Sequence, residues 1–207
     1  MTRLLGAFRR ERNGLVADTM HYDGARYGLN YGVSLTTVRR LVRELEPERD
    51  EKFARFLLSQ QVRCLQLAAL HLADSKAWQG VEDTRVWLEA LTNSELAEEA
   101  AYALFGRLER LGEWMNGDFE LLPLYAQYGL LMAAARHTTP CAAWLDVAYQ
   151  AATRHEHRLF AQATVALWAH CANSDETTKK VVLDRLQTLG TTSLDTLLRD
   201  ELAWRIL

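Results

Sequence analysis

The chain of 207 residues has few of the residues that interrupt regular structure, with only three prolines and eleven glycines. This scarcity argues against a disordered or fibrous protein. Cysteine is also scarce: Cys64, Cys141 and Cys171 are an odd number at wide spacing, and each lies in an apolar run typical of a helix. Buried reduced thiols are therefore expected in place of a disulfide framework, and the expected location is the reducing environment of the cytoplasm.

The sequence also lacks long apolar runs and the common phosphate-binding and metal-binding motifs. The longest apolar candidate, residues 121–135, contains a proline and a glutamine and does not approach a membrane span, and the charged residues 9–12 argue against a signal peptide. There is no glycine-rich phosphate loop, nucleophile elbow or paired-cysteine zinc site. His155 and His157 are two residues apart and project from different helical faces. We therefore expect no metal, no small-molecule cofactor and no membrane.

Helix-forming residues dominate what is present. Hydrophobic residues make up 49% of the chain, and alanine, leucine, arginine and glutamate are abundant, which favours helices around a sizeable core. Apolar residues recur at helical spacing along the chain, with short polar links and no convincing strand. The segments 61–72, 121–136 and 159–171 are apolar nearly all round, which predicts buried inner helices beside more polar outer ones.

Such outer and inner helices recur in pairs at a spacing of roughly 35–40 residues, which is typical of helical repeats. The sequence therefore predicts an all-α fold, a right-handed α-α superhelix of the HEAT-like or armadillo type, in preference to a compact orthogonal bundle. One domain over residues 1–207 is expected, with N-terminal helices and a loop over 1–33 and stacked helix pairs over 34–207.

Capping residues predict where two of the helices begin. Ser34 is expected to cap a helix that runs to Leu45, because its hydroxyl can accept from a first-turn amide. Thr92 and Glu95 have the spacing of a capping box, in which a hydroxyl and a carboxylate satisfy two helical amides reciprocally.

Positive charge is concentrated at the N-terminal end. Residues 1–63 hold twelve Lys and Arg against eight Asp and Glu, a balance of +4, whereas the remaining residues hold twelve against nineteen, a balance of −7. A cationic N-terminal third can bind a polyanion in a chain whose net charge is −3. The arginines expected to contact phosphates are Arg9, Arg10, Arg12, Arg39, Arg40 and Arg43. The alternative is an ordinary solvated arginine-rich surface.

Three stretches, 30–41, 58–72 and 91–98, resemble the AlkD-type DNA alkylation repair family. In the first of them, Gly32 and Val33 are followed after one helical turn by Arg39, a pattern that also begins a repeat in that family. The resemblance covers most of the chain. It implies HEAT-like repeats, a basic concave face for duplex DNA and excision of cationic N-alkylated purines.

The resemblance also indicates which residues carry the chemistry. The family's tryptophan position falls at Ser94, its catalytic aspartate at Glu98 and a second tryptophan at Trp168, whose register relative to Leu167 stays open. Aromatic rings attract a cationic base, and a carboxylate stabilises the charge that develops on the sugar as the glycosidic bond breaks. Because Ser94 has no ring and Glu98 is one methylene longer, the resemblance implies DNA binding with weak or lost N-glycosylase activity.

Two alternative interpretations accompany this one. The first is a non-enzymatic HEAT-repeat scaffold that binds a protein or peptide partner, which the acidity after residue 63 favours. The second concerns the acidic cluster of Glu89, Glu95, Glu98 and Glu99. We expect it to be a solvated first helical turn, favoured by the helix dipole, in preference to a catalytic or metal site.

Overall fold

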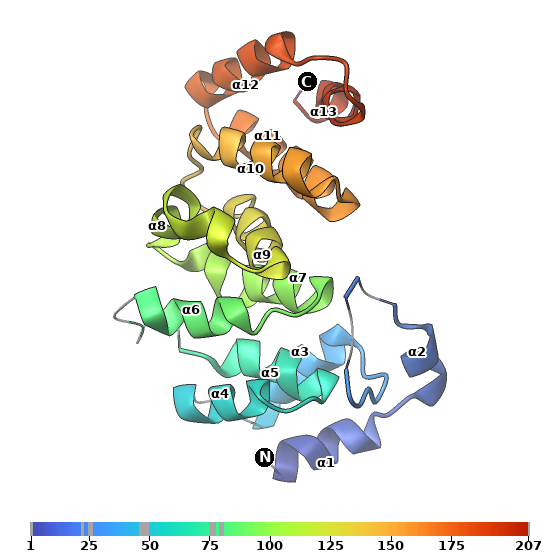
Figure 1. Ribbon diagram of the computed structural model, residues 1–207. Helices are drawn as coiled ribbons and strands as arrows, with labels where there is room; N and C mark the ends of the chain where they lie inside the picture. The colour runs from blue at the N-terminus through green and yellow to red at the C-terminus, as the bar shows by residue number, and fades with distance from the viewer. Residues whose placement is uncertain are drawn as a thin grey trace. The chain divides into compact units, whose positions relative to one another are not determined.

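The computed structural model is helical throughout its regular structure (Figure 1). It describes residues 2–21, 23–24, 27–45, 50–74, 78 and 81–206. Within these ranges the one β contact is an isolated parallel bridge between Leu29 and Val62. The all-α prediction is therefore confirmed.

The chain divides into two compact units, Met1–Leu104 (unit 1) and Phe105–Leu207 (unit 2). The single domain over residues 1–207 stays a prediction. The described helices of unit 1 are α1 (Thr2–Arg10), α2 (Gly14–Thr19), α3 (Leu35–Leu45), α4 (Glu51–Leu58), α5 (Arg63–Leu72), α6 (Val81–Glu89) and α7 (Ser94–Ala103). Those of unit 2 are η2 (Phe105–Arg107), α8 (Leu111–Asn116), η3 (Asp118–Leu121), α9 (Leu124–Ala134), α10 (Trp144–His155), α11 (Arg158–Ala172), α12 (Glu176–Thr188) and α13 (Ser193–Arg205), where η marks a 3-10 helix.

Unit 1 is organised around a row of three neighbouring helices. Helix α5 packs against both α3 and α7, while α4 covers α5 and α1 packs on α3. Eight of the ten residues of α5 are buried, as the apolar segment predicts. Helix α3 buries only Val38, Leu41 and Val42, which leaves its opposite side to polar side chains. The predicted pairing of an outer with an inner helix is therefore seen in α4 and α5.

Unit 2 has α11 at its centre, because this helix packs against α9, α10, α12 and α13. Its buried residues include Phe160, Leu167 and Trp168. Helix α9 likewise buries eight of its eleven residues. The prediction of a buried inner helix is therefore confirmed for segment 159–171, and for segment 121–136 it holds over α9, since Leu121 is exposed.

Of the two predicted helix caps, one is confirmed and one is wrong. The Ser34 hydroxyl accepts a hydrogen bond of 3.1 Å from a first-turn amide of α3. Helix α7, however, is capped by Asn93, whose Oδ1 accepts from the Leu96 amide at 3.0 Å. Thr92 is exposed before the helix. Glu95 turns away from the cap because a buried arginine binds its carboxylate.

The loop before α3, taken as residues 27–34, is fixed on both sides by backbone hydrogen bonds. The Leu29 amide donates to the carbonyl of Gln61 at 2.9 Å, and the Arg63 amide donates to the carbonyl of Leu29 at 3.0 Å. On the other side, the Asn13 amide donates to the carbonyl of Tyr31 at 2.7 Å. These bonds join the loop to the start of α5 and to the start of α2.

Gly32 is the residue that allows this loop to lie so close to α2. Its φ is +68°, in the left-handed region, and a Cβ at this position would lie 1.9 Å from the Asn13 carbonyl oxygen. Only glycine combines this backbone angle with so close an approach.

Replacing Gly32 with alanine is therefore expected to destabilise unit 1. The free energy of unfolding should fall by about 2–4 kcal/mol, because the new Cβ overlaps backbone and the positive φ strains the residue. Urea denaturation measures the change. Gly14→Ala is the matched control, since a Cβ at Gly14 meets nothing within 4 Å. Equal unfolding midpoints for the two variants would contradict this role of Gly32.

Candidate functional site

An ion-pair cluster joins the three helices of the row in unit 1. Arg39 of α3 donates two hydrogen bonds to Glu99 of α7, from Nε to Oε1 at 2.9 Å and from Nη2 to Oε2 at 2.6 Å. His71 of α5 binds the same Oε1 through its Nε2. The Glu99 side chain is only 2% exposed, whereas that of Arg39 is 33% exposed. The cluster therefore has a buried anion and a partly exposed cation.

The surroundings of Glu99 keep its carboxylate charged. Burial acts to raise the pKa of Glu99, but the hydrogen bonds and charges of His71 and Arg39 outweigh it, so the pKa lies below its usual value. The hydrogen bond to Glu99 in turn raises the pKa of Arg39. The pair is thus ionised at neutral pH, and Arg39 is held in one orientation.

Tyr102 extends this cluster to the surface. The guanidinium carbon of Arg39 lies 4.2 Å from the centroid of the Tyr102 ring, a distance typical of a cation–π contact. Tyr102 itself is 48% exposed. One helical turn of α7 thus presents a buried carboxylate and an exposed ring to the same arginine.

A second, fully buried ion pair lies deeper in the row. Arg63 of α5 donates from Nε to Glu95 Oε2 at 2.8 Å and from Nη1 to the Val33 carbonyl at 2.6 Å. Its side chain is 1% exposed and that of Glu95 is 4% exposed. The Tyr27 hydroxyl also donates to Glu95, at 2.8 Å. Burial and the negative charge of Glu95 raise the pKa of Tyr27, so the phenol stays protonated.

The interpretation of the acidic cluster as a solvated helical turn is wrong for two of its members. Glu95 and Glu99 are buried and paired, and only Glu89 and Glu98 are exposed. The sequence held one signal for this outcome. Arg63 stands in a segment that is apolar nearly all round, and a buried arginine needs a carboxylate partner.

Three of the arginines predicted to contact phosphates bind other side chains of the protein. Arg39 and Arg40 are engaged: Arg40 binds Glu11 at 3.1 Å and Glu44 at 3.0 Å, both at the surface. Arg9 donates from Nε to the Tyr31 hydroxyl at 3.2 Å.

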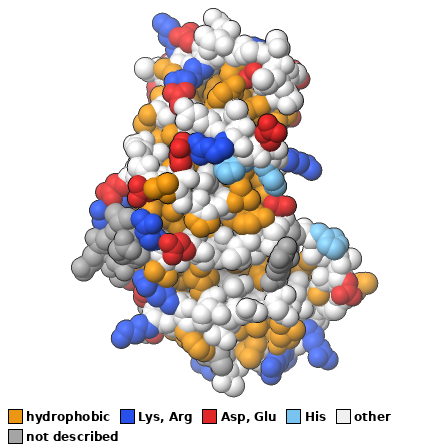
Figure 2. Space-filling view, in the orientation of Figure 1, with side chains coloured by type: hydrophobic (Ala, Val, Ile, Leu, Met, Phe, Trp, Pro, Cys, Tyr) orange, Lys and Arg blue, Asp and Glu red, His pale blue; other side chains and the backbone are white. Residues whose placement is uncertain are grey.

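Arg10, Arg12 and Arg43 are exposed, and each is without an ion pair among the described residues. The contact of Arg40 with Glu11 brings the end of α1 beside α3. On the face drawn in Figure 2, several Lys and Arg side chains lie around the part of unit 1 that contains α1. We define the α1–α3 cationic surface as Arg9, Arg10, Arg12, Arg40 and Arg43.

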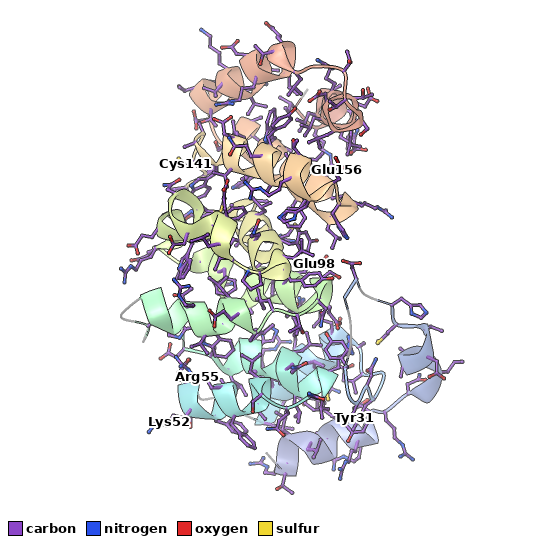
Figure 3. The ribbon with its side chains drawn as sticks, viewed as in Figure 1. Tyr31, Lys52, Arg55, Glu98, Cys141 and Glu156 are labelled. Carbon is purple, nitrogen blue, oxygen red and sulfur yellow. The ribbon has the colours of Figure 1, made fainter. Side chains whose placement is uncertain are left out.

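The two remaining predicted site residues differ in exposure. Glu98 lies at the exposed edge of α7 in unit 1 (Figure 3). Trp168 in unit 2 is 1% exposed, its indole N–H donates to the Leu145 carbonyl at 3.2 Å, and its ring lies 6.3 Å from that of Tyr149. In this structure Trp168 is a core residue, and no base can stack on its ring without repacking.

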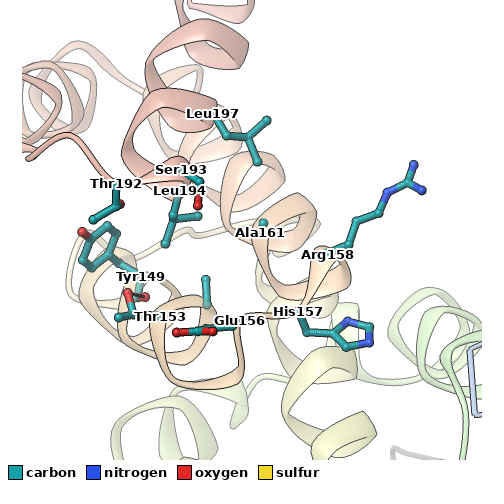
Figure 4. Close-up of a pocket in the computed structure, with 11 residues that line it drawn as sticks. Tyr149, Thr153, Glu156, His157, Arg158, Ala161, Thr192, Ser193, Leu194 and Leu197 are labelled. Carbon is teal, nitrogen blue, oxygen red and sulfur yellow. Dashed lines mark hydrogen bonds between the residues drawn. The ribbon is translucent and has the colours of Figure 1, made fainter.

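Unit 2 contains a groove between α10, the start of α11 and the start of α13 (Figure 4). Its volume is about 640 Å³, and its walls include Tyr149, Glu156, Leu194 and Leu197. Glu156 has a φ of 47°, the left-handed conformation, and its carboxylate is exposed beside apolar side chains. His157 and Arg158 also line the groove, so its wall combines apolar side chains with a carboxylate and a guanidinium. A protein or peptide partner stays a prediction.

Within the described ranges, no three His, Cys, Asp or Glu residues are grouped so that they could hold a metal ion. Burial raises the pKa of Cys64 and of Cys171 to about 12, so both thiols are protonated, while Cys141 is half-buried (Figure 3). None of the helices that the structure describes is long and apolar enough to cross a membrane.

Successive helices that pack as a row of inner helices with outer helices against them define a helical-repeat protein. A solved structure with this fold matches 98% of the chain and 94% of its own length, with a TM-score of 0.70 and 10% sequence identity. It is described as a member of a new family of proteins related to the HEAT-like repeat DNA glycosylases, with affinity for branched DNA structures. The HEAT-like prediction and, at the level of fold, the resemblance to DNA alkylation repair proteins are confirmed. No family profile matches the chain, and none of the curated proteins matches it significantly.

Removing one partner of the buried ion pair is expected to be costly. Glu95→Ala leaves the Arg63 guanidinium buried without its counter-charge, and we expect the free energy of unfolding to fall by about 3–5 kcal/mol. Glu113→Ala is the matched control, because it breaks the exposed pair of Arg110 and Glu113, whose contribution solvent screening keeps small. Chemical denaturation of the two variants measures both values. A loss for Glu95→Ala as small as that for Glu113→Ala would show that water reaches Arg63.

Proposed function

We propose that the protein binds DNA through the α1–α3 cationic surface. The observation that carries the proposal is the state of its arginines: Arg10, Arg12 and Arg43 are exposed and lack an ion pair among the described residues. Arginines that are not neutralised by nearby carboxylates attract phosphates and release the counterions bound to them. Its five arginines outnumber the two carboxylates, Glu11 and Glu44, that form ion pairs with them among the described residues, in a chain whose net charge is −3.

The fold supports the same proposal. The solved structure that shares it is described as having affinity for branched DNA. Phosphate contacts alone fix position and affinity but read no sequence. We therefore propose binding without sequence preference to duplex DNA and to junctions built from duplex arms.

The salt dependence of binding tests this proposal. Fluorescence anisotropy with a labelled duplex and a labelled junction should show affinity falling steeply between low and physiological salt. The combined variant Arg10→Gln, Arg12→Gln, Arg43→Gln should bind more weakly at every salt concentration. The slope of log affinity against log salt should become shallower by roughly 0.9 for each phosphate that the variant no longer neutralises.

Exposed arginines of unit 2 provide the matched control. Arg107→Gln with Arg158→Gln removes two exposed arginines that lie outside the α1–α3 cationic surface. We expect this variant to retain the wild-type slope. Equal reductions of affinity in the two variants would indicate diffuse electrostatic attraction, and no binding of wild-type protein at low salt would exclude the proposal.

We also propose that the protein excises alkylated bases. Glu98 is the group that stabilises the positive charge developing on the sugar. Glu98 supports it by being exposed on α7, next in sequence to the cluster at Glu99. Protein incubated with methylated DNA should release alkylated base slowly. Glu98→Gln should reduce that rate by about a hundredfold, because the charge is removed and the shape is kept. Glu89→Gln, on α6, is the control, and equal release by Glu98→Gln and wild type would rule out this role.

A further inference from the structure

We infer that Tyr102 and Arg39 form a stacking site for an unpaired nucleobase at a DNA branch point. This inference rests on the proposed DNA binding. It specifies which part of the DNA the protein recognises. Tyr102 is an exposed aromatic residue whose ring is already fixed on one side by Arg39. An aromatic side chain that is fixed before binding stacks on a base at a lower entropic cost than a mobile one.

The rigidity of the site comes from a chain of contacts through the row. The Tyr102 ring rests on the Arg39 guanidinium, which is held by two hydrogen bonds to Glu99. Glu99 is 2% exposed and is also bound by His71 of α5. Three helices therefore determine where one surface ring lies.

Arg39 also determines which face of the ring is available to a base. Its Nε and Nη2 are occupied by Glu99, while Nη1 makes no hydrogen bond among the described residues. The Arg39 side chain is one-third exposed. Because the guanidinium covers one face of the Tyr102 ring, a base stacks on the opposite face. The charge of Arg39 is balanced by Glu99, so the site favours a base over a phosphate.

Helix α3 connects this site to the α1–α3 cationic surface. Successive residues of an α-helix are rotated by about 100°, so Arg43 lies about 40° from Arg39 and Arg40 lies about 100° from it on the same side. The buried residues Val38, Leu41 and Val42 are rotated from Arg39 in the other direction, by about 60° to 160°. A DNA backbone bound at Arg40 and Arg43 therefore passes next to the ring of Tyr102.

An intact duplex cannot use this site, because its bases are stacked within the helix. Branch points expose bases that lack a stacking neighbour or a pairing partner, and stacking on an aromatic side chain is available to any base. The site therefore favours branched DNA with an unpaired base over continuous duplex, without reading sequence.

A pair of matched junctions tests the inference. One three-way junction carries a single unpaired 2-aminopurine at the branch point, and the other carries an abasic position there. Wild-type protein should bind the first about tenfold more tightly. The emission of 2-aminopurine should fall on binding, as it does when this base stacks. Tyr102→Ala should abolish both effects and leave affinity for the abasic junction unchanged, whereas Tyr102→Phe should preserve them.

Phe56→Ala is the matched control variant, because Phe56 of α4 is 46% exposed, about as much as Tyr102. It should behave as wild type on both junctions. If wild-type protein binds and Tyr102→Ala affects both junctions equally or neither, the stacking site is wrong and the DNA-binding proposal stands. If wild-type protein binds neither junction at low salt, the DNA-binding proposal itself fails, and the inference fails with it.

Discussion

The structure of unit 1 depends on the placement of a full positive charge in its interior. Arg63 is 1% exposed at the start of α5, and the cost of removing a guanidinium from water is met only if its hydrogen bonds and its counter-charge are supplied. Glu95 of α7 and the Val33 carbonyl supply them. Because these partners come from the loop before α3 and from α7, only one alignment of the row satisfies the arginine. Such a pair contributes more to the choice of one arrangement than to net stability.

The surface cluster repeats this arrangement closer to solvent. Glu99 is as buried as Glu95, yet its partner Arg39 reaches the surface and supports the ring of Tyr102. A buried carboxylate thus fixes a surface aromatic residue through an arginine that spans the distance between them. The arginines of α3 therefore differ in role: Arg39 organises the protein, Arg40 binds two surface carboxylates, and Arg43 is exposed without an ion pair among the described residues.

Much of the fold could be predicted from the sequence, because helix formation is local. A buried helix can also be recognised in the sequence, because apolar residues occur on all of its faces. The segment 61–72 is an example, and so is the Ser34 cap. The capping box at Thr92 could not be judged correctly, because Glu95 is drawn away from the cap by an arginine 32 residues earlier. The ion pairs of the candidate site could not be predicted from the sequence for the same reason. Pairings between distant residues such as Arg39 and Glu99 depend on how the helices align, and periodicity alone does not fix that alignment.

The backbone bonds of the loop before α3 have a consequence for how unit 1 opens. The amides of Leu29 and Arg63 are shared between this loop and the start of α5, and Tyr27 is bound to the buried carboxylate of Glu95. A segment without regular structure usually opens on its own, with little protection of its amides against exchange with solvent. Here the loop cannot separate from the helices of the row without breaking contacts in the core. The loop and the three helices of the row therefore belong to one cooperative unit, whose amide protons exchange only when that unit unfolds.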